Sequence, residues 1–260
     1  HRKEDVSISP YDRGFLFGDG VYEVIPSYSG EMLLYDEHIS RLARSLEAVS
    51  IDKPRQWNNL EPIIEDLLQR NKFENQAVYI QVTRGQDKIR SHVPDKLTAP
   101  TLFIESSELS TDLLQPDFKE PLIDVGMEED LRWSRCDIKA ITLLGNVLTL
   151  NELNDVGLEE VIFYKDGYIT EGAKSNIFFV FGEEIVTPPT SKNILSGITR
   201  NYLIDLLRKN NFNVVEREIS VNEIEEADEI WFSSSVQVLR MVHKINNKLV
   251  LEKDFKNTIG

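Results

Sequence analysis

The sequence contains few of the features that mark secreted, membrane-bound and metal-binding proteins. Its one cysteine, Cys136, cannot form an internal disulfide, which excludes a disulfide-stapled secreted scaffold. No apolar run approaches the roughly 18 residues of a membrane-spanning helix. The opening stretch HRKEDVSISP has no apolar core of the kind that a signal peptide carries. We therefore expect a cytoplasmic protein with no membrane association.

Positive charge and histidine are also scarce. There are 29 lysines and arginines against 44 aspartates and glutamates, which gives a net charge of −15 and a pI of about 4.8. An acidic chain repels phosphates and anionic lipids, so neither nucleic acid nor a membrane surface is an expected partner. The histidines are His1, His38, His92 and His243, and because none has metal-ligand spacing to another, no metal site is expected. Cys136 has no histidine near it in the sequence and is interpreted as a structural thiol, and no G-x-S-x-G elbow is present.

The rest of the composition is that of a globular protein. The chain has 260 residues, of which 41% are hydrophobic, enough for one large domain or two moderate ones. Apolar residues at helical spacing predict helices at 39–49, with Asp36 as the N-cap, and at 60–68 and 199–210. The long apolar segment 138–153 predicts a buried helix. The predicted strands are 21–28, 77–84, 101–105, 122–125, 161–164, 168–170, 177–181, 185–187, 214–217, 229–233 and 239–245.

These elements predict an α+β architecture in two domains. Residues 1–106 form the first domain and residues 122–260 the second. Residues 107–121, with two prolines and no clean periodicity, are the predicted linker. Ser29-Gly30 follows the predicted strand 21–28, which looks like one arm of a hairpin, and Asp166-Gly167 lies between two predicted strands as a strong hairpin turn signal. A cleft between two such domains commonly holds a small molecule.

Lys139 and Glu171 are the first candidates for chemistry. Lys139 stands at the head of an apolar segment, where partial desolvation favours the neutral amine that forms Schiff bases. Glu171 ends a predicted strand before Gly172, where a carboxylate can pair with a ring nitrogen and keep it protonated. Taken alone, each is better explained as an ordinary residue, a surface lysine at a helix start and a glutamate beside a turn.

Other segments are suited to binding anions. Ser196-Gly197-Ile198-Thr199 opens a predicted helix, whose first N–H groups and a hydroxyl can hold an anion. Ser233-Ser234-Ser235 can add hydroxyls, and Arg41 can make a forked contact to phosphate. Arg90-Ser91-His92 follows a strand, so its two basic side chains can reach the same carboxylate. In isolation, ordinary capping, a polar turn, a solvated helix face and a solvated loop explain these segments equally.

The order of the motifs is more informative than any one of them. They are Asp12-Arg-Gly, Gly18-Asp-Gly-Val-Tyr-Glu, His38-Ile-Ser-Arg-Leu, Val82-Thr-Arg-Gly, Lys139 followed by Leu144-Gly, Thr170-Glu-Gly with Ser175-Asn, and Gly197-Ile-Thr-Arg. Together they resemble the fold type IV transaminases that depend on pyridoxal 5′-phosphate (PLP). That group includes D-amino acid and branched-chain aminotransferases and aminodeoxychorismate lyase. The resemblance extends from about residue 8 to about residue 245 and implies the α+β two-domain fold of the group.

The resemblance implies a role for each matching position. Lys139 is the expected catalytic residue, which holds PLP and shuttles the proton, and Glu171 is the expected partner of the pyridine nitrogen. Leu195 is expected to pack against the cofactor ring. The residues expected at the phosphate are Arg41, Gly197, Ile198, Thr199, Ser234 and Ser235.

The same resemblance implies a substrate class. Arg90 and His92 match the Arg-x-His loop of D-amino acid transaminases, where the pair, with the tyrosine matched by Tyr22, holds the substrate α-carboxylate. That loop comes from the partner subunit, which implies a homodimer. The implied reaction moves the amino group of a D-amino acid such as D-alanine to a 2-oxo acid such as 2-oxoglutarate.

Some positions depart from the pattern, and alternatives remain. Ala173-Lys174 stands where D-amino acid enzymes carry small hydroxyl residues, and Pro26 is unusual within a strand. Branched-chain enzymes carry an aromatic-x-arginine pattern near positions 23–27, and no arginine is present there. A branched-chain L-amino acid aminotransferase and aminodeoxychorismate lyase are the alternative enzymes. A PLP-binding protein without catalytic activity is the alternative outside enzymes.

Overall fold

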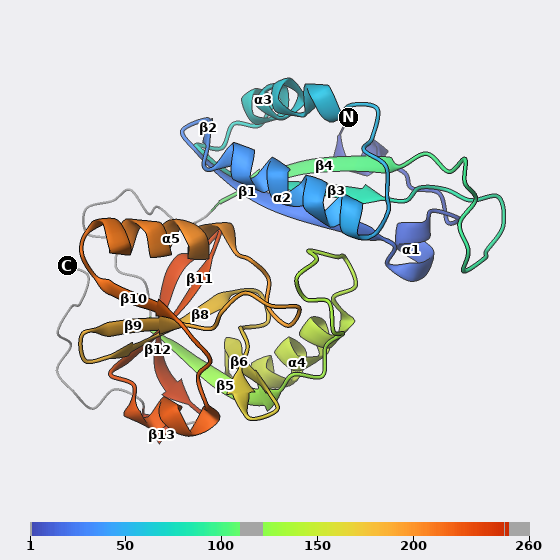
Figure 1. Cartoon of the computed structure of the whole chain (residues 1–260). Helices are drawn as coiled ribbons and strands as arrows, with labels where there is room; N and C mark the ends of the chain where they lie inside the picture. The colour runs from blue at the N-terminus through green and yellow to red at the C-terminus, as the bar shows by residue number, and fades with distance from the viewer. Residues whose placement is uncertain (1, 110–121, 247, 250–260) are drawn as a thin grey trace. The chain divides into compact units, whose positions relative to one another are not determined.

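The computed structural model describes residues 2–109, 122–246 and 248–249 (Figure 1). The chain divides into two compact units, of which the first comprises His1–Asp112 with Ile138–Thr142 and the second Leu113–Asp137 with Leu143–Gly260. Lys139 therefore belongs to the first unit, whereas we expected it in a domain spanning 122–260. The predicted linker 107–121 lies mostly outside the described residues.

An antiparallel sheet forms the base of the first unit. Its strand order is β2-β1-β3-β4, with β1 at Gly20–Tyr28, β2 at Glu31–Met32, β3 at Asn75–Thr83 and β4 at Thr101–Glu108. The predicted turn between β1 and β2 is confirmed, since Ser29 and Gly30 have φ angles of 50° and 88°. Residues 107 and 108 belong to β4, so the predicted linker began too early.

Two amphipathic helices cover one face of this sheet. Helix α2 spans Tyr35–Ala48 and helix α3 spans Leu60–Arg70, as the apolar periodicity predicted. Shorter helical segments are η1 (Lys3–Asp5), α1 (Arg13–Phe17) and η2 (Trp57–Asn59). The buried core between sheet and helices includes Val21, Ile25, Leu42, Leu46, Ile64, Leu68, Val78, Ile80 and Val82. The N-cap prediction was wrong, because Leu34 occupies that position and Asp36 lies in the first turn, where its charge still favours the helix dipole.

The segment that carries Lys139 is extended and pairs with β1. The backbone N–H of Tyr22 donates to the carbonyl of Lys139 (2.9 Å), and the N–H of Ile141 donates to the carbonyl of Gly20 (3.1 Å). Because Ile138 and Ala140 are both buried in the core of the first unit, the apolar residues here alternate with a period of two, as in a strand. The predicted buried helix over 138–153 is therefore wrong.

Helix α4 begins only at Leu144 and ends at Asn154. It is not a buried helix either, since Leu144 is 71% exposed and Leu148 is 54% exposed.

The second unit contains one large mixed sheet in the order β10-β9-β8-β11-β12-β5-β6-β7, with β13 pairing to β12. The strands are β5 (Ile123–Glu129), β6 (Glu160–Lys165), β7 (Tyr168–Ile169), β8 (Asn176–Phe181), β9 (Glu184–Thr187), β10 (Asn213–Glu216), β11 (Glu229–Ser234), β12 (Val238–Ile245) and β13 (Lys248–Leu249). The β6–β7 turn has positive φ at Asp166 (51°) and Gly167 (83°), as predicted for an Asp-Gly hairpin.

The large sheet curls around a single core. Strands far apart in the order contribute to the same cluster, for example Ile123 of β5, Ile177 of β8 and Val186 of β9. Helix α5, Ile198–Lys209, packs on the outer face of β8, β9 and β11, and α4 packs on the outer face of β6. The remaining helical segment is η3, Val221–Glu226. None of the helices in the described part of the chain has the length and apolar character that crossing a bilayer requires.

The loop 86–99 connects β3 to β4, and its two ends meet at Gly85. Gly85 has a φ of +101°, and a Cβ atom built on it would overlap the carbonyl oxygen of Ala99. Only glycine allows both this φ and this close approach of backbone to backbone.

We predict that Gly85→Ala destabilises the protein more than Gly30→Ala does. Both glycines have positive φ, so an alanine at either costs about 1–2 kcal/mol of backbone strain. Gly30 has nothing within 4 Å of the added methyl, whereas at Gly85 the methyl also pushes the loop end away from β3. Urea unfolding of the two variants measures the difference, and equal losses of stability would contradict this account of the loop.

Candidate functional site

A buried ion cluster joins β1 to α2 in the first unit. Glu23 shares a strand face with Val21 and Ile25, so its carboxylate points to the helix-covered side. Arg41 donates to Glu23 through Nε (2.6 Å) and Nη2 (2.8 Å), and Nδ1 of His38 lies 2.7 Å from Glu23 Oε2. Glu23, His38 and Arg41 are all buried. The arginine expected at the phosphate is therefore fixed in one orientation.

The cluster keeps Glu23 ionised. Burial alone would raise the pKa of Glu23, but the hydrogen bonds and charge of Arg41, with help from His38 and Lys139, lower it to about 2. Sequence reasoning named Arg41 and missed its partners. Two signals were present: a charged residue on the apolar period of β1, and a histidine and an arginine three positions apart on one helix face.

Lys139 and Tyr22 lie together on the other side of β1. The Nζ atom of Lys139 is 4.3 Å from the centre of the Tyr22 ring, and that ring packs against Tyr79 with 5.6 Å between ring centres. Lys139 is half-buried, because its segment pairs with β1 while its side chain alternates away from the core. The first unit thus places the predicted residues Lys139 and Tyr22 together on one side of β1, and Arg41, bound to Glu23, on the helix-covered side.

Arg90 and His92 lie on the loop 86–99, and both side chains are exposed. The guanidinium carbon of Arg90 is 4.9 Å from the centre of the Phe17 ring, and the His92 ring is 5.4 Å from it. Two basic side chains therefore rest on one aromatic ring of α1. Sequence reasoning found this pair but gave Phe17 no part in it.

Glu171 is the centre of a second buried cluster, in the second unit. Its carboxylate accepts from Arg132 Nη1 (3.0 Å), Asn176 Nδ2 (3.1 Å) and the backbone N–H of Leu195 (3.0 Å). Burial raises the pKa of Glu171 to about 7, although Arg132 and the Leu195 N–H act in the opposite direction. Arg132 is shared, because Asp130 binds it through Nε (2.9 Å) and Nη2 (2.8 Å).

Asn176 connects Glu171 to the start of α5. Its Nδ2 also donates to the carbonyl of Leu195 (2.8 Å), and a Cβ on Gly197 would overlap its Oδ1. Gly197 is the N-cap of α5 and offers no side chain to cap the N–H groups that follow, those of Ile198 and Thr199. Sequence reasoning found Leu195, Gly197, Ile198 and Thr199 but missed Arg132, because no local pattern pairs it with a glutamate 39 positions later.

The last predicted residues, Ser234 and Ser235, follow the buried part of β11 and are half-buried. The Oγ of Ser234 accepts from the backbone N–H of Gln237 (3.2 Å). The neighbouring Ser233 has a buried Oγ without a hydrogen-bond partner among the described residues. A buried hydroxyl of this kind is satisfied when a polar ligand binds beside it.

The family model for class IV aminotransferases matches residues 20–245, which is most of the chain. The chain belongs to the class IV aminotransferases. The D-alanine aminotransferase of Listeria monocytogenes is 34% identical to this aminotransferase over 246 residues, which cover 93% of this chain and 83% of that relative. The resemblance drawn from the order of the sequence motifs is thereby confirmed.

Two solved structures show the fold of this aminotransferase. The branched-chain amino acid aminotransferase of Escherichia coli matches with a TM-score of 0.86 at 23% identity, covering 97% of this chain and 86% of that one. A hypothetical aminotransferase of Mycobacterium tuberculosis, solved in a PLP-bound form, matches with a TM-score of 0.83 at 20% identity, covering 97% and 90%. The predicted α+β fold of type IV is confirmed, and the family is one of PLP-dependent enzymes.

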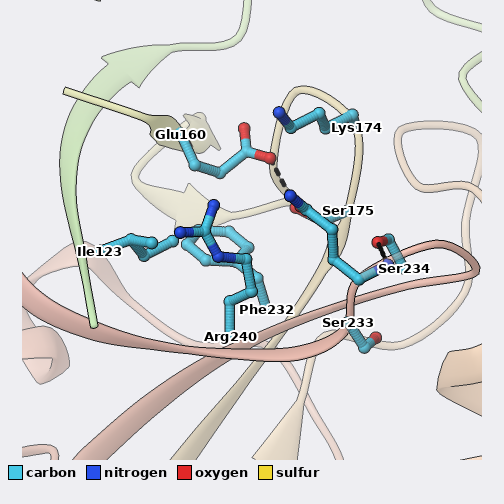
Figure 2. A pocket seen from close by; sticks show the side chains of 9 residues that line it. Ile123, Glu160, Lys174, Ser175, Phe232, Ser233, Ser234 and Arg240 are labelled. Carbon is cyan, nitrogen blue, oxygen red and sulfur yellow. Dashed lines mark hydrogen bonds between the residues drawn. The ribbon is translucent and has the colours of Figure 1, made fainter. Parts of the chain in front are cut away.

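A small pocket of this aminotransferase lies beside the end of β11, and Figure 2 shows the side chains that line it. It contains Lys174, at a position where we noted a departure from D-amino acid enzymes, next to Ser233 and Ser234. The buried Glu160 accepts from the N–H of Ala173 (2.9 Å) and from Ser175 Oγ (2.9 Å). Glu160 therefore shapes the turn that follows Glu171 and that places Lys174 in the pocket.

We predict that Glu171→Gln changes the pH dependence of the free energy of unfolding of the PLP-free protein. The folded carboxyl has a pKa of about 7 against 4.5 for the ordinary group, so between these values the folded state binds more protons than the unfolded state. The wild type loses stability as the pH rises through this window, and the glutamine variant does not. Relative to the wild type, the free energy of unfolding of the glutamine variant should therefore increase by about 3 kcal/mol as the pH rises through this window.

Urea unfolding at about pH 4.5 and about pH 8 measures this change, with Glu23→Gln as the control. The pKa of Glu23 is about 2, so its carboxylate is charged in the folded protein throughout the window and contributes no such slope. A constant offset between Glu171→Gln and the wild type would show that the folded carboxyl titrates normally.

Proposed function

We propose that this aminotransferase transfers the amino group of a D-amino acid, such as D-alanine, to a 2-oxo acid, such as 2-oxoglutarate, with PLP as cofactor. The observation that carries the substrate class is the exposed pair Arg90 and His92, held on one aromatic ring at the tip of a tightly closed loop. Such a pair suits a carboxylate. The 34% identity to a D-alanine aminotransferase over 93% of the chain supports the same substrate.

The residues present fit PLP. Glu171 is a buried carboxylate beside which a cationic ring nitrogen would be stabilised. The start of α5 after Gly197 has N–H groups without a side-chain cap. This feature suits a phosphate group. We therefore assign the cofactor to Lys139, Glu171 and Leu195, and the phosphate to Arg41, Gly197, Ile198, Thr199, Ser234 and Ser235.

Bound PLP would supply the electron sink that makes the α-proton of an amino acid acidic enough to remove. The Nζ atom of Lys139 holds the cofactor and then takes the proton from the α-carbon of the substrate. Glu171 keeps positive charge at the ring nitrogen, and Glu23 holds the guanidinium of Arg41 in a fixed plane for the phosphate. Tyr22 packs beside Lys139 and limits the directions that its amine can take.

We further propose that the enzyme works as a cytoplasmic homodimer in which one subunit's loop serves its partner. The loop that carries Arg90 and His92 also exposes Ile89 (70%), Val93 (77%) and Leu97 (89%). Apolar side chains concentrated on an exposed loop favour contact with another protein surface. Burial of this loop against a second copy of the chain would cover these residues and present both basic side chains to a substrate.

We predict that D-alanine bleaches the visible absorbance band of the PLP-loaded protein and that L-alanine does not. Only a substrate that passes its amino group to the cofactor removes that band, and the two enantiomers differ in nothing but the hand of the α-carbon. Titration with L-leucine covers the branched-chain alternative. Bleaching by L-leucine alone would move the enzyme to that class. A band that every amino acid tested leaves in place would favour the lyase, which does not pass an amino group to the cofactor.

We predict that Lys139→Ala lowers the turnover of D-alanine by at least about 10³-fold, because one group serves as attachment point, base and acid. The matched control is Lys209→Ala, which removes a lysine from the last turn of α5. The control should keep wild-type turnover. Activity of Lys139→Ala within tenfold of the wild type would exclude this lysine as the catalytic residue.

A further inference from the structure

Helix α1 contains a buried arginine that the proposed reaction does not use. The side chain of Arg13 is 4% exposed, and it forms ion pairs with Asp19 (Nε, 2.9 Å) and Asp87 (Nη1, 2.9 Å). Two carboxylates offset the cost of burying one guanidinium, so the charge is stable where it lies. The hydrogen bonds and charges of Asp19 and Asp87 outweigh burial and raise the pKa of Arg13, so it stays a cation.

The remaining donors of Arg13 bind the tip of the loop 86–99. Nη1 donates to the carbonyl of Ser91 (2.6 Å), and Nη2 donates to the carbonyl of His92 (3.0 Å). The planar fork of the guanidinium thus fixes two successive peptide groups. These two peptide groups flank His92 and set the direction of its side chain, and Arg90 lies two residues earlier in the same tip.

Besides the Arg13 N–H, which donates to the carbonyl of Gly85 (2.8 Å), and the ion pair with Asp87, other residues hold the base of the loop. Asp12 Oδ2 accepts from Thr83 (2.9 Å) at the end of β3 and from Thr101 (2.8 Å) at the start of β4. Asp87 also accepts from the hydroxyl of Thr98, which closes the loop on itself. The contacts of Arg13 with Ser91 and His92 are therefore not needed to hold the strands together, and their effect is confined to the tip.

Phe17, at the other end of α1, contacts the side chains of the same tip. Its ring centre lies 4.9 Å from the guanidinium carbon of Arg90 and 5.4 Å from the His92 ring. It also lies 4.9 Å from the guanidinium carbon of Arg13. Helix α1 accordingly holds the backbone of the tip through Arg13 and its two basic side chains through Phe17.

We propose that Arg13 and Phe17 are positioning residues for the substrate carboxylate: they hold Arg90 and His92 in the conformation that binds it. This role rests on the proposed function, in which Arg90 and His92 bind that carboxylate. Arg13 and Phe17 touch neither cofactor nor substrate in this role. Their effect is therefore expected on carboxylate affinity and not on the chemistry at Lys139.

The test compares Arg13→Lys with Arg84→Lys in the PLP-loaded enzyme. Arg84 is a matched control, because it also binds Asp19 (2.8 Å) and two carbonyls, those of Val49 and Ser50, and makes no contact with the loop tip among its hydrogen bonds. Lysine keeps the charge in both variants and removes the fork. The measurements are KM and kcat for D-alanine, the inhibition constant of propionate, which carries only the carboxylate, and the absorbance band of bound PLP.

We expect Arg13→Lys to raise KM for D-alanine and the inhibition constant of propionate about tenfold or more, with kcat within about threefold and the PLP band unchanged. Arg84→Lys should leave all four values near those of the wild type. Equal propionate inhibition constants in the two variants, or a loss in kcat alone, would overturn the proposal.

A second variant decides the matter if Arg13→Lys fails to fold. Phe17→Leu keeps the hydrogen bonds of Arg13 and removes only the ring beneath Arg90 and His92, and it should raise the propionate inhibition constant severalfold. An unchanged constant would overturn the proposal. Failure of the proposed function has a different signature, since the wild type itself would then neither turn over D-alanine nor bind propionate competitively.

Discussion

A buried guanidinium is tolerated only where a carboxylate lies within hydrogen-bond distance, and three such pairings fix the groups assigned to catalysis. Glu23 holds Arg41, Asp19 and Asp87 hold Arg13, and Asp130 with Glu171 holds Arg132. Each of the three includes a partner far away in the sequence, as in Glu23 with Arg41, Asp87 with Arg13 and Glu171 with Arg132. Without the carboxylates, each arginine would leave the interior and take with it the group it positions.

This constraint also bears on the acidic composition. A net charge of −15 disfavours large anionic partners, because an acidic surface repels them, but it does not show whether a small pocket is locally basic. The structure shows that several carboxylates are inside, where they neutralise arginines instead of facing solvent. Two basic side chains, Arg90 and His92, remain exposed on their loop. Net charge therefore constrains large charged partners and says little about a small carboxylate.

Local patterns predicted most of the fold, and the errors have physical reasons. Apolar residues at helical spacing placed α2, α3 and α5, and Asp166-Gly167 placed a hairpin, because these features depend on neighbours in the chain. The segment 138–142 was mistaken for helix. The segment is extended because it hydrogen-bonds to the free edge of β1, and nothing within the segment itself indicates that pairing.

The same distinction separates the site residues that were found from those that were missed. Lys139, Glu171 and Arg41 belong to ordered motifs, so the sequence could name them. Arg132 could not be named, because its importance comes from sharing its donors between Asp130 and Glu171, which only the folded chain brings together. The pKa values of Glu23 and Glu171 differ because their arginine partners are shared differently. Arg41 binds Glu23 through two donors and lowers its pKa to about 2, whereas Arg132 gives Glu171 one donor and Asp130 two, so burial leaves the pKa of Glu171 at about 7. Glu171 is thus a buried carboxylate short of positive charge. A protonated ring nitrogen supplies that charge, so the incomplete pairing of Glu171 favours a cationic ligand where a fully paired carboxylate would not.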